Sequence, residues 1–301
     1  MTWSVGNGRA RWRAGSSRRL RAGVSLHSRQ MTPRPLAGLK VVILCGGLGT
    51  RLREETEHRP KPLVPIGNRP ILWHIMRSYA AFGFTDFILA LGYKGEMIKD
   101  YFLNYDVLTS DFSLHLGSKS IQRLSPSDDE ASWRITFVDT GEETMTGGRL
   151  RRLRQVLDSE SQFLFTYGDG VTDLNIAAVV DFHRRSGCIA VVTGVRPQTR
   201  FGELTVKGDR VVRFAEKPPT NDTWINGGYF VMTPQVFDYI ESDRTVLERE
   251  PLERLAAESQ LGVYKHDGYW QPMDTYRDMQ LLNEQWKSGR APWVSQWERA
   301  A

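Results

Sequence analysis

Strand-length apolar runs alternate with helical patterns along most of this chain, beginning at Lys40. Short apolar runs predict buried strands, and apolar residues spaced three and four apart predict amphipathic helices. Strands joined by helix-length crossovers pair in parallel and place helices on both faces of the sheet. The sequence therefore predicts an α/β protein with a mostly parallel central sheet. The predicted strands are 41–44, 87–91, 134–138, 163–167 and 189–195, and the predicted helices are 71–82, 96–103, 149–157 and 176–185.

Two regions interrupt this alternation. Residues 104–131 are polar and contain a Ser-Pro-Ser-Asp-Asp-Glu run, which predicts loops around one short strand at 112–116. After Pro197 the pattern changes to short strands at 204–206, 211–215 and 229–232, and the stretch from Pro234 onward is predicted to be largely helical. We expect a single domain over 38–301 with an inserted loop region at about 104–131.

The positive charge of the chain is confined to its N-terminal segment. The 301 residues carry a net charge of +5 with a pI near 9.2, a balance that favours nucleic acid or another anionic partner. Residues 1–37 hold eight arginines and no acidic residue, and the remainder of the chain has a net charge of −3. We expect 1–37 to be a disordered extension, with Met31 as an alternative start, and we expect no nucleic-acid partner. A transit peptide and a nucleic-acid-binding arm remain the alternatives for this segment.

The apolar runs and the cysteines indicate the compartment. No run approaches the roughly 20 apolar residues that span a bilayer, and residues 1–37 lack a secretory apolar stretch, so we expect a soluble protein without a membrane partner. Cys45 and Cys188 offer neither a disulfide framework nor a metal-binding spacing. We expect a reducing compartment and therefore a cytoplasmic protein.

A glycine-rich turn follows the first predicted strand and reads Cys45-Gly46-Gly47-Leu48-Gly49-Thr50-Arg51-Leu52. Glycines at such a turn let backbone N–H groups approach phosphate closely. The spacing excludes the dinucleotide fingerprint Gly-x-Gly-x-x-Gly, and Gly49-Thr50-Arg51 excludes a P-loop, which needs Gly-Lys-Ser/Thr. The turn predicts a phosphate loop that carries its own cation, Arg51. A tight turn with a solvated arginine is the alternative.

Lys61 lies ten residues beyond this loop and is flanked by Pro60 and Pro62. Two prolines fix the backbone around the lysine and lower the entropy lost when its ammonium is aimed at an anion. Next to a phosphate loop, this pattern favours an anion-binding lysine over an ordinary solvated one.

Two aspartates are candidate metal ligands. Asp169 follows strand 163–167 and lies between Gly168 and Gly170, at the carboxyl end of a strand where α/β sheets bind ligands. Mg²⁺ takes one or two protein carboxylates and completes its shell with phosphates and water. Asp274 precedes a helical pattern, so it is either a second ligand or the N-cap of that helix.

These segments resemble the sugar-1-phosphate nucleotidyltransferases. The glycine loop at 44–52 followed by Lys61-Pro62-Leu63 is similar to the signature of that family, and the similarity runs from about residue 40 to residue 297. The segments 145–150 and 269–274 resemble the branch that acts on glucose 1-phosphate with CTP, with further support from 92–102, 166–171 and 225–230. Cys45 departs from the alanine usual there, and a small buried apolar residue accounts for it.

The resemblance implies a Rossmann-like nucleotidyltransferase fold, a homo-oligomer, and transfer of a cytidylyl group from CTP to α-D-glucose 1-phosphate. It implies that Asp169 and Asp274 hold Mg²⁺, and that Arg51, Lys61 and Asp169 are catalytic. The substrate-binding residues that it implies are Leu44, Cys45, Gly46, Gly47, Leu48, Gly49, Thr50, Arg51, Lys61, Thr144, Arg149, Gly168 and Lys217.

The choice of nucleotide base depends on the resemblance alone. Thr140 and Gly141 follow strand 134–138 and, with Thr144, are placed to line a base pocket. Thymidylyl, uridylyl and guanylyl transfer remain alternatives. A glycosyltransferase usually offers Asp-x-Asp, whereas this strand is followed by Asp169-Gly170-Val171. The attacking sugar phosphate is already anionic near pH 7, so no histidine base is required.

Overall fold

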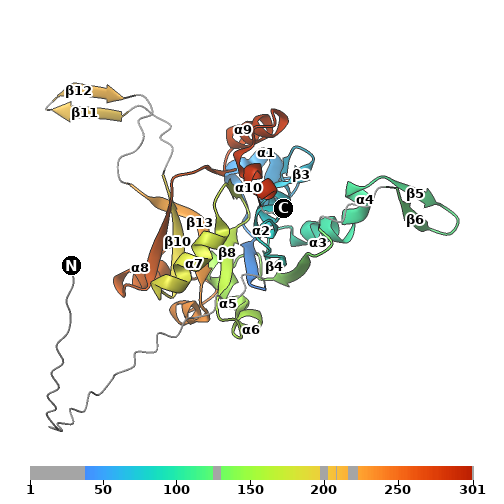
Figure 1. The fold of residues 1–301 in the computed structure, drawn as a ribbon, viewed down its shortest axis with the longest axis horizontal. Helices are drawn as coiled ribbons and strands as arrows, with labels where there is room; N and C mark the ends of the chain where they lie inside the picture. The colour runs from blue at the N-terminus through green and yellow to red at the C-terminus, as the bar shows by residue number, and fades with distance from the viewer. Residues whose placement is uncertain (1–37, 125–129, 197–202, 208, 216–222, 300–301) are drawn as a thin grey trace, which may run out of the picture. The chain divides into compact units, whose positions relative to one another are not determined.

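A seven-stranded mixed sheet forms the centre of the computed structural model, which describes residues 38–124, 130–196, 203–207, 209–215 and 223–299 (Figure 1). The strand order is β14-β10-β13-β8-β1-β4-β7, and β13 alone is antiparallel to both of its neighbours. The predicted mostly parallel sheet is therefore confirmed. Its strands are β1 (Lys40–Leu44), β4 (Asp86–Leu91), β7 (Arg134–Asp139), β8 (Phe163–Tyr167), β10 (Ala190–Val195), β13 (Ile225–Met232) and β14 (Leu261–His266).

Helices cover both faces of this sheet, as its buried strands require. Successive side chains of a strand point to opposite faces, and β1 accordingly sends Val41 and Ile43 into one core and Val42 and Leu44 into the other. The first core is closed by α2 (Ile71–Ala80), α3 (Gly95–Leu103) and α7 (Ile176–Ser186), and the second by α5 (Thr146–Arg152), α6 (Arg154–Leu157), η3 (Pro234–Tyr239) and α8 (Glu250–Ala257).

Within the described ranges four small strand pairs accompany the sheet, and two of them correct the sequence prediction. The inserted region contains α4 (Tyr105–Thr109) and a hairpin of β5 (Phe112–His115) with β6 (Ser120–Arg123), not one strand among loops. The stretch after Pro234 has mostly helical elements, as predicted, but it also contains β14 and β15 (Trp270–Pro272), which the sequence did not predict, and β15 pairs with β9 (Gly170–Thr172). The other pairs are β2 (Pro65–Ile66) with β3 (Arg69–Pro70), and β11 (Glu203–Lys207) with β12 (Arg210–Ala215).

The C-terminal segment packs on α2 through a buried histidine. The indole Nε1 of Trp293 donates to Nδ1 of His74 at 3.3 Å, and Nε2 of His74 lies 3.0 Å from the carbonyl oxygen of Ile66. Burial lowers the pKa of His74 to about 4, so the ring is neutral near pH 7. This histidine therefore has a structural role. The segment is completed by α9 (Tyr276–Lys287), η4 (Pro292–Val294) and α10 (Ser295–Arg299).

The predicted N-terminal extension at 1–37 lies outside the described residues, and its boundary with the domain remains a prediction. Among the helices of the described part, none has both the length and the apolar character needed to cross a membrane.

Candidate active site

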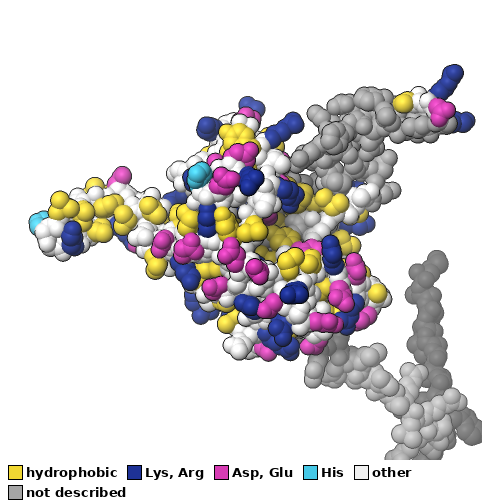
Figure 2. Space-filling model, turned by 180° about the vertical axis from the view of Figure 1, so that it is seen from behind, with side chains coloured by type: hydrophobic (Ala, Val, Ile, Leu, Met, Phe, Trp, Pro, Cys, Tyr) yellow, Lys and Arg dark blue, Asp and Glu magenta, His cyan; other side chains and the backbone are white. Residues whose placement is uncertain are grey.

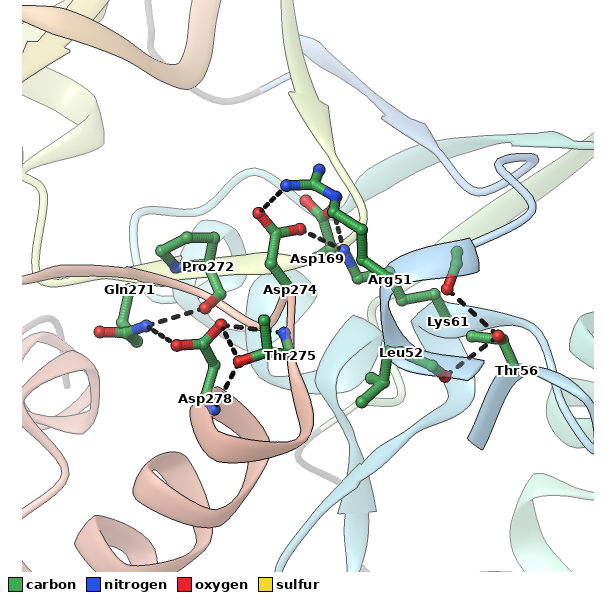
Figure 3. Close-up of polar contacts among 11 residues, drawn as sticks. Arg51, Leu52, Thr56, Lys61, Asp169, Gln271, Pro272, Asp274, Thr275 and Asp278 are labelled. Atoms are coloured by element: carbon green, nitrogen blue, oxygen red, sulfur yellow. Dashed lines mark hydrogen bonds and ion pairs between the residues drawn. The ribbon is translucent and has the colours of Figure 1, made fainter. Parts of the chain in front are cut away.

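The glycine loop leaves β1 in a conformation that only small residues allow. Gly49 has φ of +64°, and a Cβ added there would lie 2.6 Å from the Cγ2 of Thr56. The Thr56 hydroxyl contacts the carbonyl oxygen of Gly49 at 3.1 Å and that of Leu52 at 3.0 Å, which closes the turn (Figure 3). Two short helices follow, η1 (Thr50–Leu52) and α1 (Arg53–Thr56). Hydrogen bonds from Thr56, which follows the loop in the chain, therefore stabilise its conformation.

A cavity of about 460 Å³ opens over this loop. Most of the predicted substrate-binding residues line it, and they come from several segments distant in sequence. The predicted residues in its wall are Leu44, Cys45, Gly46, Gly47, Leu48, Gly49, Thr50, Arg51, Lys61, Thr144, Arg149, Gly168 and Asp169.

Two cations and two carboxylates meet at the edge of this cavity (Figure 3). The ammonium Nζ of Lys61 lies 2.7 Å from Oδ2 of Asp169 and 2.7 Å from Oδ1 of Asp274. Nη1 of Arg51 lies 2.8 Å from Oδ2 of Asp274. Burial by itself lowers the pKa of Lys61, but the two carboxylates outweigh it, so the pKa is raised and the ammonium stays charged. The four side chains form one ionic cluster, which the sequence did not predict as a unit.

The backbone sets the spacing of the two carboxylates. Asp169 directly precedes β9, Asp274 closely follows β15, and these strands pair with Pro272 opposite Gly170. The N–H of Met273 also donates to the carbonyl oxygen of Asp169 at 2.8 Å. Strand pairing, and not side-chain packing alone, therefore brings the carboxylates together.

Asp274 is not the N-cap of the following helix, so that alternative is wrong. Thr275 caps α9, because its hydroxyl accepts from the N–H of Asp278 at 3.2 Å while a carboxylate oxygen of Asp278 accepts from the N–H of Thr275 at 2.9 Å. This reciprocal capping box satisfies the helix end. The Asp274 carboxylate does not cap the helix and instead pairs with Lys61 and Arg51.

The carboxylate pair suits a hard divalent cation. The described residues contain no group of three or more His, Cys, Asp or Glu side chains that could hold a metal, but Mg²⁺ needs only one or two carboxylates when substrate phosphates and water supply the rest. One positive centre, the Lys61 ammonium, already lies within hydrogen-bonding distance of both carboxylates. The donor set and its spacing therefore fit Mg²⁺.

Arg149 lies in the cavity wall but is engaged by the protein itself. Its guanidinium donates to the carbonyl oxygens of Leu91, Gly141, Gly46 and Glu142 and to the Thr140 hydroxyl, at 2.7 to 3.1 Å. A Cβ on Gly46 or Gly92 would lie 2.2 or 2.4 Å from its Nη1. These glycines therefore make room for a buried guanidinium that joins the glycine loop to the carboxyl ends of β4 and β7.

Thr140 and Gly141 accept hydrogen bonds from the Arg149 guanidinium, but they do not line the cavity with the other predicted site residues. Thr140 is fully buried, and its hydroxyl donates to the carbonyl oxygen of Leu91 at 2.6 Å. Neither Thr140 nor Gly141 is in the cavity wall. Lys217 lies outside the described residues.

Comparisons with known proteins agree with this geometry. A family model described as "Nucleotidyl transferase" matches residues 40–279. The chain belongs to the nucleotidyl transferase family. A glucose-1-phosphate cytidylyltransferase of Salmonella typhimurium is 48% identical over 86% of this chain and 100% of the relative. A probable glucose-1-phosphate cytidylyltransferase of Bacillus subtilis is 43% identical over 85% of this chain and 99% of the relative.

The fold is likewise shared with solved structures. HddC from Yersinia pseudotuberculosis superposes with a TM-score of 0.61 at 22% identity, covering 82% of this chain and 99% of that one. At this identity the likeness concerns the fold alone, and it agrees with the predicted nucleotidyltransferase architecture.

Sequence reasoning missed several residues of this nucleotidyltransferase cavity. Pro62, Glu142, Glu143, Met145, Thr146 and Tyr167 complete its wall. The Tyr167 hydroxyl donates to Glu248, and Thr146 donates to the same carboxylate at 2.6 Å. A smaller cavity of about 50 Å³ adjoins Asp169 and is lined partly by Asn226, Gly227 and Gly228. Most of these positions lie in segments that carried the family resemblance, so the resemblance could have indicated them. The segments are 145–150, 166–171 and 225–230.

Proposed function

We propose that this chain transfers a cytidylyl group from CTP to α-D-glucose 1-phosphate and releases pyrophosphate. An oxygen of the sugar phosphate attacks the α-phosphorus of CTP, a P–O bond forms, and the bond to the β-phosphate breaks. The products are CDP-glucose and pyrophosphate. The observation that carries the proposal is the cavity that joins a glycine loop to the ionic cluster of Arg51, Lys61, Asp169 and Asp274. The two cytidylyltransferase relatives support the choice of base and sugar.

The chemistry of this reaction matches the residue types in the cavity. A phosphate monoester has a second pKa of about 6, so the nucleophile is anionic near pH 7 and needs no general base. The difficulty is to bring two polyanions together, which calls for positioning and charge neutralisation. Arg51 and the loop N–H groups bind the leaving pyrophosphate, and Lys61 binds the phosphate at the reaction centre.

Nucleotidyltransferases of this family generally use a divalent metal. We propose Mg²⁺ held by Asp169 and Asp274. When bound, it supplies positive charge that offsets the negative charge of the phosphates.

A turnover panel tests the proposal. With glucose 1-phosphate and Mg²⁺, we expect CTP to give the highest rate of pyrophosphate release among CTP, UTP, dTTP and GTP. A site built to accept from the cytosine amine rejects a base that lacks this donor strongly, by as much as about 10⁴-fold. A higher rate with another nucleotide would replace cytidylyl transfer with that activity.

We also propose that the protein is a homo-oligomer, with the inserted region in the contact. The hairpin of β5 and β6, the adjoining α4 and the end of α3 expose seven large aliphatic side chains among the described residues, and Figure 2 shows apolar side chains gathered over this arm. Monomeric soluble proteins rarely expose apolar patches of this extent. The seven are Leu103, Val107, Leu108, Leu114, Leu116, Ile121 and Leu124.

Light scattering after size exclusion tests the contact. We expect the unaltered chain to form an oligomer at micromolar concentration, and Leu108→Glu combined with Leu116→Glu to shift it toward the monomer. The matched control is Val263→Glu, at an exposed position of β14 outside the arm. A monomeric unaltered chain, or an oligomer unaffected by the double substitution, would remove this role from the arm.

We also propose that the protein is located in the cytoplasm. Its two cysteines are both free, which fits a reducing compartment.

A further inference from the structure

The carboxylates proposed for the metal already have cationic partners within the chain. Three of their four oxygens lie within 2.8 Å of a nitrogen of Lys61 or Arg51. Two negative groups are thus matched by two positive groups. A divalent cation that approaches this cluster alone meets two like charges as well as its ligands.

Lys61 and Arg51 differ in how firmly they are held. The Lys61 side chain is 11% exposed and lies in η2 (Lys61–Leu63) between two prolines. The Arg51 side chain is 73% exposed and contacts Asp274 from the open side of the cluster. Lys61 is therefore the cation that lies between the two carboxylates, whereas Arg51 contacts Asp274 from the solvent-exposed side of the cluster.

We propose that the Lys61 ammonium occupies the position between Asp169 and Asp274 that a divalent cation needs, so that metal enters together with the nucleotide and not before it. The inference rests on the proposed function. A polyphosphate offers Lys61 and Arg51 new anionic partners, which frees carboxylate oxygens as the metal arrives. By linkage, the nucleotide then raises the affinity for metal and the metal raises the affinity for nucleotide by the same factor. Lys61 thus makes metal binding conditional on substrate.

The competing arrangement makes an opposite prediction. If the metal bound beside an undisplaced Lys61, removal of the lysine would leave the affinity for free metal unchanged or would weaken it by disordering the carboxylates. Displacement predicts the reverse, because removal of the lysine removes a competing cation.

Mn²⁺ binding to the full chain without nucleotide distinguishes these arrangements. Free Mn²⁺, measured by electron paramagnetic resonance, should reveal weak binding to the unaltered protein and at least about tenfold tighter binding to Lys61→Met, which corresponds to about 1.4 kcal/mol. Lys61→Gln should change the affinity in the same direction. Lys40→Met is the matched control, because Lys40 is also partly buried and pairs with Glu160 at 2.9 Å. It should bind Mn²⁺ as the unaltered protein does. Unchanged or weaker binding by both Lys61 variants would overturn the proposal.

A second readout guards against misfolding. Without the lysine two carboxylates repel each other, so Lys61→Met should melt at a lower temperature than the unaltered protein. Mg²⁺ without nucleotide should raise the melting temperature of Lys61→Met more than that of the unaltered chain, since a ligand that binds the folded state more tightly stabilises it more. Equal shifts would contradict the proposal.

A double substitution separates this inference from the proposed metal site. Adding Asp169→Asn to Lys61→Met should abolish the gain in Mn²⁺ affinity. If the double variant still bound Mn²⁺ tightly, the ion would lie elsewhere, and both the inference and the metal site would be wrong. If Lys61→Met showed no gain while turnover still depended on both aspartates, only the inference would be wrong.

Discussion

Asp169→Asn is expected to lower the rate of nucleotidyl transfer by about 10³-fold, a loss near 4 kcal/mol of transition-state stabilisation. The substitution keeps the shape of the side chain but removes its charge. Asp169 lies next to the carboxyl end of β8, faces the Lys61 ammonium at 2.7 Å and lines the cavity. The loss should appear in kcat at saturating Mg²⁺ and substrates.

The control for this measurement is Asp158→Asn. That carboxylate is 55% exposed at the C-terminal end of α6 and pairs with Arg154 one helical turn earlier. Its replacement should change kcat by less than about twofold, because exposed ion pairs contribute little. Turnover of Asp169→Asn close to that of the unaltered enzyme would exclude this residue from the metal site.

Arg149→Met is expected to reduce the free energy of unfolding by about 3 kcal/mol, because it leaves buried acceptors without a donor. Burial is the main influence on the guanidinium and lowers its pKa, and all five acceptors that surround it are neutral oxygen atoms. Its contacts join three loops around the cavity. Urea unfolding measures the effect, and nucleotide affinity should fall with it, since the Gly46 carbonyl loses its anchor.

Arg152→Met, from the end of the same helix, is the control. Arg152 is 42% exposed and pairs with Asp243 at 2.6 Å, so its replacement should cost less than about 1 kcal/mol. A loss for Arg149→Met no larger than that of the control would mean that the five contacts contribute little to stability.

The long strands and the place of Asp169 could be predicted from local sequence. Each buried strand of a parallel sheet appears as an apolar run, and β1 and β8 differ from their predicted bounds by no more than one residue. Because β8 ends at Tyr167, the glycine-flanked aspartate had to lie at its carboxyl end. The local sequence pattern was sufficient to predict those strands that are buried on both faces, because such a strand appears as a continuous apolar run.

Short or half-buried strands could not be found in this way. β9 and β15 have three residues each, too few for any periodicity to appear. β14 lies at the edge of the sheet and alternates partly buried with exposed residues, so its sequence lacks the apolar run of a central strand. These elements depend on partners that are distant in the chain.

The ion pairs and hydrogen bonds of the site could not be predicted from sequence either, because they also join residues that are distant in the chain. Lys61 contacts carboxylates 108 and 213 residues away, and the acceptors of Arg149 come from three separate segments. The sequence predicted anions for both side chains but could not show that the protein itself supplies carboxylates to one and neutral oxygens to the other.

The pairing of β9 with β15 also decides when this site can form during protein synthesis. The glycine loop, Lys61 and Asp169 are all translated before β15, yet the second carboxylate follows Asp169 by roughly 100 residues, or about 5–20 s of elongation. Until β15 emerges from the ribosome, Lys61 has only one of its two carboxylates and the register that places Asp274 does not exist. A nascent chain therefore contains the glycine loop and Lys61 well before it contains both carboxylates of the ionic cluster.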